Sequence, residues 1–403
     1  MNETKKLGLG SVVSVSVGLV IATSCLVSLG QGAGTIGVTF IIAMVVALAL
    51  NLTTIASLSE LNALMPNTTG GLAQYTMAGL GPFPTLISMV GGYLICNVLS
   101  CGVEASIFSY AMAQTFSFIP IPSIAWSLIM TVLIMIVNLY GVDMFAKIQD
   151  LVSYLLIGSM AILGIICVVQ SIMVLGFHNY IPWKELLSSP APHLLYGERL
   201  LGNVGKIWMT LVGALAVVST QNSTANGLSR ICQGMAGMNM LPQIFAKTNK
   251  YDVPWFGVVI ISAAIGFFAW MSDSSSDGIS FFILVGSVFW MVSYILAHID
   301  VLVLRRRLPK APRSFKVPGG PILPLIGIAG TVFMILNIST DPAERNMIWL
   351  VTGVTLLALA VYAVFWIKYK MRRPVFKHVP LNEVMAMENK MYGKIRRARG
   401  VWK

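Results

Sequence analysis

Apolar residues in this chain gather into long runs that short polar segments separate. Each run has about 20 residues, which lets a helix cross the hydrocarbon core of a bilayer. A transmembrane domain over 12–367 would lie between an N-terminal segment, 1–11, and a C-terminal tail, 368–403. The pattern predicts an all-α polytopic membrane protein with about ten spans, at residues 12–37, 38–59, 84–112, 123–141, 151–177, 203–231, 255–272, 279–303, 321–338 and 347–367.

The composition supports the same class. Hydrophobic residues make up 56% of the chain and charged residues only 10%, whereas a soluble domain carries about 25% charged residues. The five cysteines all fall in or beside the predicted spans. We therefore expect them to be small packing residues and not a disulfide framework or a zinc site.

Basic residues are distributed unevenly between the two sides that these spans define. With the N-terminus inside, 23 of the 27 Lys and Arg residues lie on the inner side. Such a bias marks cytoplasmic loops, so we expect a multi-pass protein of the cell (plasma) membrane with both termini in the cytoplasm. Because topology explains the net charge of +12, the bilayer is the expected partner and nucleic acid is not.

The first predicted span has an unusual centre. Ala22, Thr23, Ser24 and Cys25 are small and partly polar, and glycines crowd the residues that follow them. Such residues lower helix propensity, and unwound helix centres bind substrate and ions in transporters. Close helix packing through small residues explains the same pattern equally well.

Acidic residues within the spans are candidates for function. Glu104 lies deep in the run 84–112, where an intramembrane acid is either a proton or cation site or a residue that orders helix packing. His298 and Asp300 stand near the inner end of the run 279–303. We expect both to be interfacial helix-end residues, with Asp300 pairing with the arginines at 305–307.

The sequence offers little for other kinds of chemistry. Its four histidines are scattered, and no nucleophile is paired with a base. We therefore expect no metal site, no cofactor and no enzymatic activity.

Three long segments resemble the amino acid–polyamine–organocation (APC) superfamily of permeases. They are "SELNALMPNTTGGLAQYTMAGLGPF" (59–83), "NGLSRICQGMAGMNMLPQIFAKTNKYDVPWFG" (226–257) and "SYILAHIDVLVLRRRLPKAPRSFKVPGGPILPLIG" (293–327). The resemblance implies a leucine-transporter-type fold, with two inverted five-helix repeats and broken first and sixth helices at the substrate site. It also implies secondary active transport of amino acids, by a permease or exchanger that works through alternating access.

The resemblance also places candidate site residues. The family's helix break falls on Ala22, Thr23 and Ser24, where this chain has no glycine, and Leu156 stands where some relatives have a lysine. The coupling ion is therefore open between Na⁺ and H⁺, with Glu104, Ser219 and Thr220 as coupling candidates. The substrate-binding candidates, whose character favours small neutral amino acids, are Ile21, Ala22, Thr23, Ser24, Cys25, Ile95, Cys96, Ser100 and Thr224.

The chain is incomplete relative to the family's twelve spans. The fifth span begins normally, the loop that starts near Asn179 resembles the loop after the seventh, and nothing between them resembles the sixth. The simplest account joins spans five and seven within residues 164–177, which we call the junction segment. The fused run 151–177 would be about 40 Å long as a helix. A family branch with ten true spans is the alternative, and we favour the deletion.

A deletion of this kind has consequences for function. Alternating access around a central site requires both broken helices, so loss of the sixth span would impair transport. We expect the first span to be more continuously helical than in full-length relatives, because unwound backbone exposed to lipid is costly. A non-transporting shortened isoform or degenerate membrane protein is the alternative function.

Overall fold

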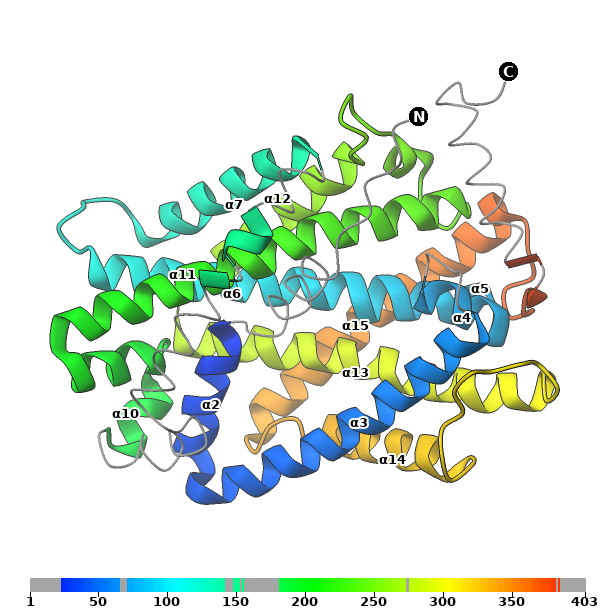
Figure 1. Cartoon of the computed structure of the whole chain (residues 1–403), viewed down its shortest axis with the longest axis horizontal. Helices are drawn as coiled ribbons and strands as arrows, with labels where there is room; N and C mark the ends of the chain where they lie inside the picture. The colour runs from blue at the N-terminus through cyan, green and yellow to red at the C-terminus, as the bar shows by residue number, and fades with distance from the viewer. Residues whose placement is uncertain are drawn as a thin grey trace. The chain divides into compact units, whose positions relative to one another are not determined.

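A computed structural model describes residues 23–65, 71–141, 148–152, 154–155, 181–272, 275–381 and 383–384. Helices account for the regular structure of these residues (Figure 1). In chain order they are α2 (Thr23–Ile36), η1 (Gly37–Thr39), α3 (Phe40–Leu64), α4 (Leu72–Gly79), α5 (Pro82–Leu86), η2 (Ile87–Ile95), α6 (Cys96–Thr115), α7 (Ser123–Leu139), α10 (Trp183–Ser188), α11 (Pro192–Gly237), η3 (Gln243–Ala246), α12 (Trp255–Met271), α13 (Ser276–Arg307), α14 (Ile322–Leu336), α15 (Pro342–Trp366) and η4 (Ile367–Met371).

The helices confirm an all-α polytopic membrane protein. Among the described residues, five helical stretches are long and apolar enough to cross a membrane, and α7, α12 and α14 are shorter apolar helices. The turn at η1 separates α2 from α3 where the sequence predicts the boundary between the first two spans. The first span before Thr23 and the junction segment lie outside the described residues.

Proline and capping residues set several helix starts. Pro122 precedes α7 and Pro254 precedes α12. At α15, the carboxylate of Asp341 accepts hydrogen bonds from the amides of Ala343 and Glu344. These contacts satisfy amides that have no partner inside the helix, and Pro342 stands at a position where a missing N–H costs nothing.

The long helix α11 consists of two helices joined at Gly202. Gly202 has φ 60° and ψ −144°, a conformation that side-chain-bearing residues rarely adopt. The chain turns back there, so that a Cβ on Gly197 would lie 2.6 Å from the carbonyl oxygen of Gly205. The membrane-spanning part therefore begins at residue 203, as the hydrophobic pattern predicts.

Glycines in α2 serve close packing. This half of the first predicted span is helical from Thr23 to Ile36. A Cβ on Gly30 would collide with the ring of Pro192, and one on Gly32 would collide with the ring of Phe40. Between the two explanations for the small residues of the first span, packing accounts for these two glycines.

The chain divides into two compact units. Unit 1 comprises residues 1–44, 97–229 and 248–283. Unit 2 comprises residues 45–96, 230–247 and 284–403. Each unit is described separately below.

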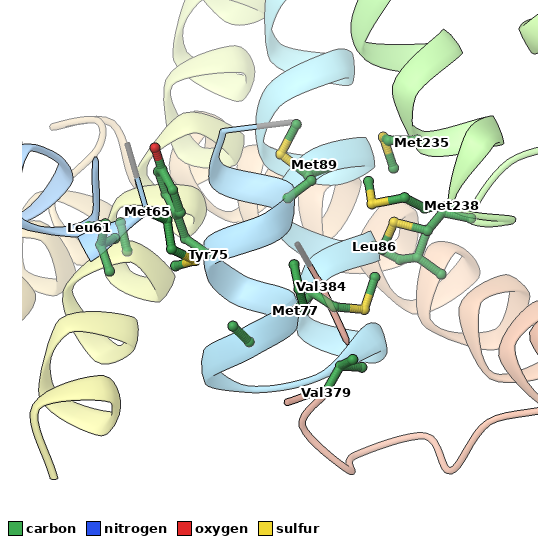
Figure 2. Close-up of a cluster of buried hydrophobic side chains, with 14 of the residues drawn as sticks. Leu61, Met65, Tyr75, Met77, Leu86, Met89, Met235, Met238, Val379 and Val384 are labelled. Carbon is green, nitrogen blue, oxygen red and sulfur yellow. The ribbon is translucent and has the colours of Figure 1, made fainter. Parts of the chain in front are cut away.

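Unit 2 has a core that is rich in methionine and that links many of its helices (Figure 2). Met77 of α4, Met89 of η2 and Met235 of α11 are buried in it. Val379 and Val384, from the segment after η4, reach the same core. Methionine fits irregular gaps between helices that cross at different angles, so this core joins the C-terminal segment to the helices of unit 2.

In unit 1, small residues allow helices to approach closely. Helices α7 and α12 lie side by side (Figure 1). Gly257 of α12 faces the backbone of Ser229 of α11, and Gly102 of α6 faces Phe268 of α12. A Cβ on Gly102 would lie 2.6 Å from the Cβ of Phe268 and 3.3 Å from the amide nitrogen of Ala269. The α6–α12 contact therefore depends on the absence of a side chain at this position.

We expect Gly102→Ala to destabilise the protein by about 1–3 kcal/mol, because the added methyl group must push α12 away from α6. The measurement is thermal unfolding of the purified protein in detergent. Gly353→Ala on α15 is the matched control, since a Cβ there meets nothing within 4 Å. Equal melting temperatures for the two variants would contradict the close packing described.

Candidate functional site

A stretch of six polar residues, Ser219–Thr224, lies in the membrane-spanning part of α11. All six side chains are buried, with at most 6% of any residue exposed. A helix that is polar on every side over almost two turns is costly to place in a membrane, and such residues are usually retained for function. We call these residues the polar segment of α11.

Side-chain amides join the polar segment to two other parts of unit 1. Asn138 of α7 donates to the Oδ1 atom of Asn222 at 2.8 Å. Asn222 donates to the Oε1 atom of Gln149 at 3.2 Å, and Gln149 donates to the hydroxyl of Ser219 at 2.6 Å. The chain of amides therefore fixes residues 148–152 and α7 against one face of α11.

Two hydroxyls of the polar segment are not used in this way. The Oγ of Ser223 and the Oγ1 of Thr224 are buried and have no hydrogen-bond partner in the described part of the chain. A buried hydroxyl without a partner costs about 1–3 kcal/mol. A polar ligand that accepts from or donates to these atoms would remove that cost.

The structure brings together some of the predicted site residues. Ser219, Thr220 and Thr224 all belong to the polar segment of α11. Glu104 is fully buried on α6, and Ser100 is partly buried one turn earlier on the same helix. These residues all belong to unit 1, so the predicted coupling residues and part of the predicted substrate site share one compact unit.

The other predicted site residues are placed differently. Ile95 and Cys96 belong to unit 2, at the junction where η2 continues into α6. The backbone of Thr23, Ser24 and Cys25 forms the first turn of α2, and Ile21 and Ala22 lie outside the described residues. The first span is therefore helical from Thr23 onward. For the residues before Thr23, a continuous helix remains a prediction.

The sequence analysis did not anticipate the π-helix η2. Its nine residues, Ile87–Ile95, are wound more widely than an α-helix and lead directly to the predicted site residues Ile95 and Cys96. The hydroxyl of Ser293 donates to the carbonyl of Ser88 at 2.7 Å within this stretch. Because π-helical turns are frequent at functional sites, the position of η2 favours a functional role for this region of the third span.

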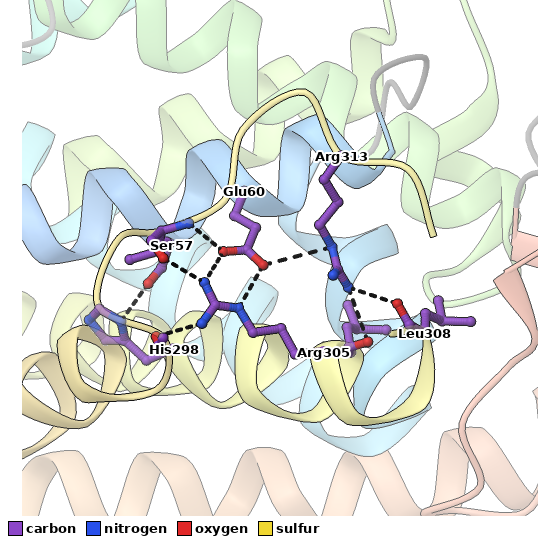
Figure 3. A network of polar contacts seen from close by, with 9 residues as sticks. Ser57, Glu60, His298, Arg305, Leu308 and Arg313 are labelled. Atoms are coloured by element: carbon purple, nitrogen blue, oxygen red, sulfur yellow. Dashed lines mark hydrogen bonds and ion pairs between the residues drawn. The ribbon is translucent and has the colours of Figure 1, made fainter. Parts of the chain in front are cut away.

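Unit 2 contains a buried charge cluster formed by Glu60, Arg305 and Arg313 (Figure 3). Arg305 binds Glu60 with two hydrogen bonds, from Nε to Oε1 at 2.8 Å and from Nη2 to Oε2 at 2.5 Å. The Nε atom of Arg313 lies 3.7 Å from Oε1 of Glu60. The amide of Val317 also donates to Glu60, at 2.8 Å.

The same arginines bind the loop that follows α13. Arg305 donates to the carbonyls of Val317 at 3.0 Å and Gly320 at 2.5 Å. Arg313 donates to the carbonyls of Leu304 and Leu308 at the end of α13. The cluster therefore holds the loop between α13 and α14 against the end of α3. In the sequence, the signal for this cluster was Glu60, an acidic residue directly after the predicted span 38–59.

The predicted pairing of Asp300 with the arginines was wrong. Asp300 and His298 are both fully buried within the protein, toward the end of α13. Asp300 accepts a hydrogen bond from the hydroxyl of Thr76 at 2.6 Å and does not pair with the arginines, because Glu60 binds Arg305 instead. The ring of His298 contacts the hydroxyls of Ser57 at 2.9 Å and Thr54 at 3.3 Å.

The side chains of these clusters can form hydrogen bonds and ion pairs, with other helices or with a bound molecule. Within the described ranges, no three His, Cys, Asp or Glu side chains gather as a metal site. The described cysteines Cys96, Cys101 and Cys232 are buried, in agreement with their expected packing role. Buried amides, hydroxyls and one deep acid suit the recognition of a small polar molecule or ion.

Comparison with known proteins gives two family matches. Residues 156–366, more than half of the chain, match a family described as "Amino acid permease". Residues 11–186 match a second family with the same description. The two matches overlap only at 156–186, a range that contains the junction segment.

Individual relatives are more distant. A branched-chain amino acid permease of Bacillus subtilis is 25% identical over 170 residues, which cover 40% of this chain and 34% of the relative. An amino-acid permease of the same organism is 23% identical over 219 residues, 53% of this chain and 46% of the relative. A polyamine transporter of Arabidopsis thaliana is 29% identical over 101 residues, 25% of this chain and 18% of the relative. The chain thus spans less than half the length of each.

We expect Glu60→Gln to destabilise the protein by about 3–5 kcal/mol, because it leaves two buried arginines without a carboxylate. Thermal or denaturant unfolding in detergent measures the loss. Glu185→Gln is the matched control: Glu185 pairs with Arg199 at 3.3 Å on the surface, where an ion pair contributes about 0–1 kcal/mol. A loss for Glu60→Gln no larger than the control's would show that the cluster does not fix the loop.

Proposed function

Because the chain belongs to the amino acid permease family, we propose that it carries amino acids across the plasma membrane. Transport would be secondary active, as a permease or an exchanger, and would proceed by alternating access. Both termini would lie in the cytoplasm, as the distribution of basic residues favours.

The polar segment of α11 is the observation that carries this proposal. A membrane helix keeps six consecutive buried polar residues at a considerable cost. The amide chain to α7 and Gln149 holds one face of the segment in position. The unpartnered hydroxyls of Ser223 and Thr224 then offer hydrogen bonds to a polar solute.

We place substrate and coupling ion at the predicted residues. Thr224, with Ser100 and the first turn of α2, would contact the substrate, whose class we propose to be small neutral amino acids. Glu104, Ser219 and Thr220 would contribute to coupling with H⁺ or Na⁺. The complete burial of Glu104 in α6 supports its part, since an intramembrane acid is a default candidate for a proton or cation site.

A second candidate function is a shortened form that does not transport. One observation favours it: the two family matches change over at the junction segment, since one ends at residue 186 and the other begins at residue 156, and neither covers both halves of the chain. A chain without its sixth span would keep the polar segment of α11 but lack the second broken helix that alternating access requires.

We expect proteoliposomes that contain this chain to accumulate a small neutral amino acid above the level of protein-free liposomes. A chimera that carries the sixth span of a full-length relative within residues 164–177 should transport faster, because it restores the second broken helix. Initial rates of radiolabelled uptake provide the comparison. Uptake by the chimera together with none by this chain would instead establish the shortened, non-transporting form.

We expect Thr224→Val to weaken substrate binding by about tenfold, because it removes one hydrogen bond to a bound solute. Equilibrium binding of the radiolabelled amino acid measures the effect even where transport is slow. The melting temperature should not fall, since the hydroxyl has no partner among the described residues. Thr355→Val on α15, whose hydroxyl donates to the carbonyl of Val351 at 2.8 Å, is the control and should leave binding unchanged. Unaltered affinity in Thr224→Val would remove this residue from the site.

A further inference from the structure

Unit 2 has a groove beside the end of α13 that no part of the proposed transport function uses. Its volume is about 660 Å³. We call it the tail groove, because one wall comes from the segment that follows η4. The lining residues are Ala78, Leu304, Arg307, Leu308, His378, Val379, Pro380 and Leu381.

Specific contacts fix the wall that the C-terminal segment contributes. The amide of Val379 donates to the carbonyl of Met77 at 3.1 Å. The amide of Phe83 donates to the carbonyl of Val375 at 3.3 Å. Gly81 has φ 98°, and a Cβ there would lie 2.8 Å from the carbonyl oxygen of Lys377. The groove is therefore a built feature of unit 2 and not a gap beside a loose end.

The charge of Arg307 is not neutralised by nearby acids among the described residues. Arg307 donates to the carbonyl of Gly79 at 2.6 Å, and within the described residues it forms no ion pair. Asp300 is buried and bound to Thr76, and Glu383 pairs with Arg373 at 2.5 Å. An exposed guanidinium with one hydrogen bond keeps several donors for a ligand, and its planar donor set suits phosphate oxygens.

The groove lies at the end of a helix that can span a membrane, a position that suits a lipid headgroup. Arg307 ends α13, an apolar helix long enough to span a membrane, and lies on the side predicted to be cytoplasmic. Leu304, Leu308 and Leu381 line the groove together with Arg307 and His378. An apolar wall beside a guanidinium fits an amphiphile better than a free anion. The cytoplasmic leaflet is also the one that carries anionic lipids.

We infer that the tail groove binds the phosphate group of an anionic phospholipid. Arg307 and His378 contact the phosphate, and the leucines contact the glycerol and the first part of the acyl chains. Bound lipid then links the end of α13 to the C-terminal segment. This inference does not depend on transport, since it concerns a surface outside the polar segment of α11.

The test measures thermal stability of the full chain in nanodiscs of phosphatidylcholine with increasing phosphatidylglycerol. A ligand that binds only the folded protein raises the melting temperature as its concentration rises. We expect Arg307→Gln and His378→Ala each to require about tenfold more phosphatidylglycerol for the same shift, because each removes a contact to the phosphate. Arg306→Gln, which makes the same charge change on the neighbouring exposed residue outside the groove, should behave as wild type.

Three outcomes overturn the inference. An equal loss in Arg306→Gln and Arg307→Gln would mean general attraction between basic residues and an anionic surface. A wild-type response in both groove variants would mean that the groove is empty. In detergent, dihexanoyl phosphatidylglycerol should stabilise the protein and inorganic phosphate should not; equal stabilisation by phosphate alone would assign the groove to a free anion. Because His378→Ala retains the bond between Arg307 and Gly79, it reports on the groove even if Arg307→Gln folds poorly.

Discussion

The cost of burying a charge or a polar group away from water governs both units of this protein. Glu60 illustrates how the cost is met: its two oxygens receive the guanidinium of Arg305, the amide of Val317 and the nearby charge of Arg313. Arg305 and Arg313 in turn bind four carbonyls at the end of α13 and in the loop after it. A single acid thus organises a helix end and the loop beside it, since each of these groups would otherwise be buried without a partner.

The polar segment of α11 meets the same cost in a different way. A chain of amide hydrogen bonds joins Asn138, Gln149 and Asn222, although the Oδ1 atom of Asn138 accepts none among the described residues. Ser223 and Thr224 lie next to that chain but have no partner of their own. Two open hydroxyls on a buried stretch of helix are what the proposed polar ligand would need, because helix packing alone would be served as well by alanine or valine.

The sequence predicts the helices well and the buried charges poorly, for a physical reason. Apolar run length depends on residues that are adjacent in the chain, so the starts of α7 and α12 agree with the hydrophobic pattern to the residue. The partner of a buried charge depends on residues far apart: Glu60 and Arg305 are separated by 245 positions. Asp300 was assigned to the arginines because they are neighbours in sequence, whereas its partner Thr76 comes from α4. The placement of Ser219, Thr220 and Thr224 on one buried stretch followed from the family resemblance, and the π-helix at Ile95 could not be read from composition.

The orientation of the later helices constrains the deletion that the sequence predicts. Spans five and seven of the family run in the same direction, so joining them removes one complete crossing in each direction. Every later helix then keeps its orientation, and the arginines at the end of α13 stay on the side where basic residues collect. Removal of a single span would have placed those arginines, and the Glu60 cluster that depends on them, on the opposite side. A deletion that removes a pair of crossings would therefore leave the charge cluster of unit 2 on the side where basic residues collect.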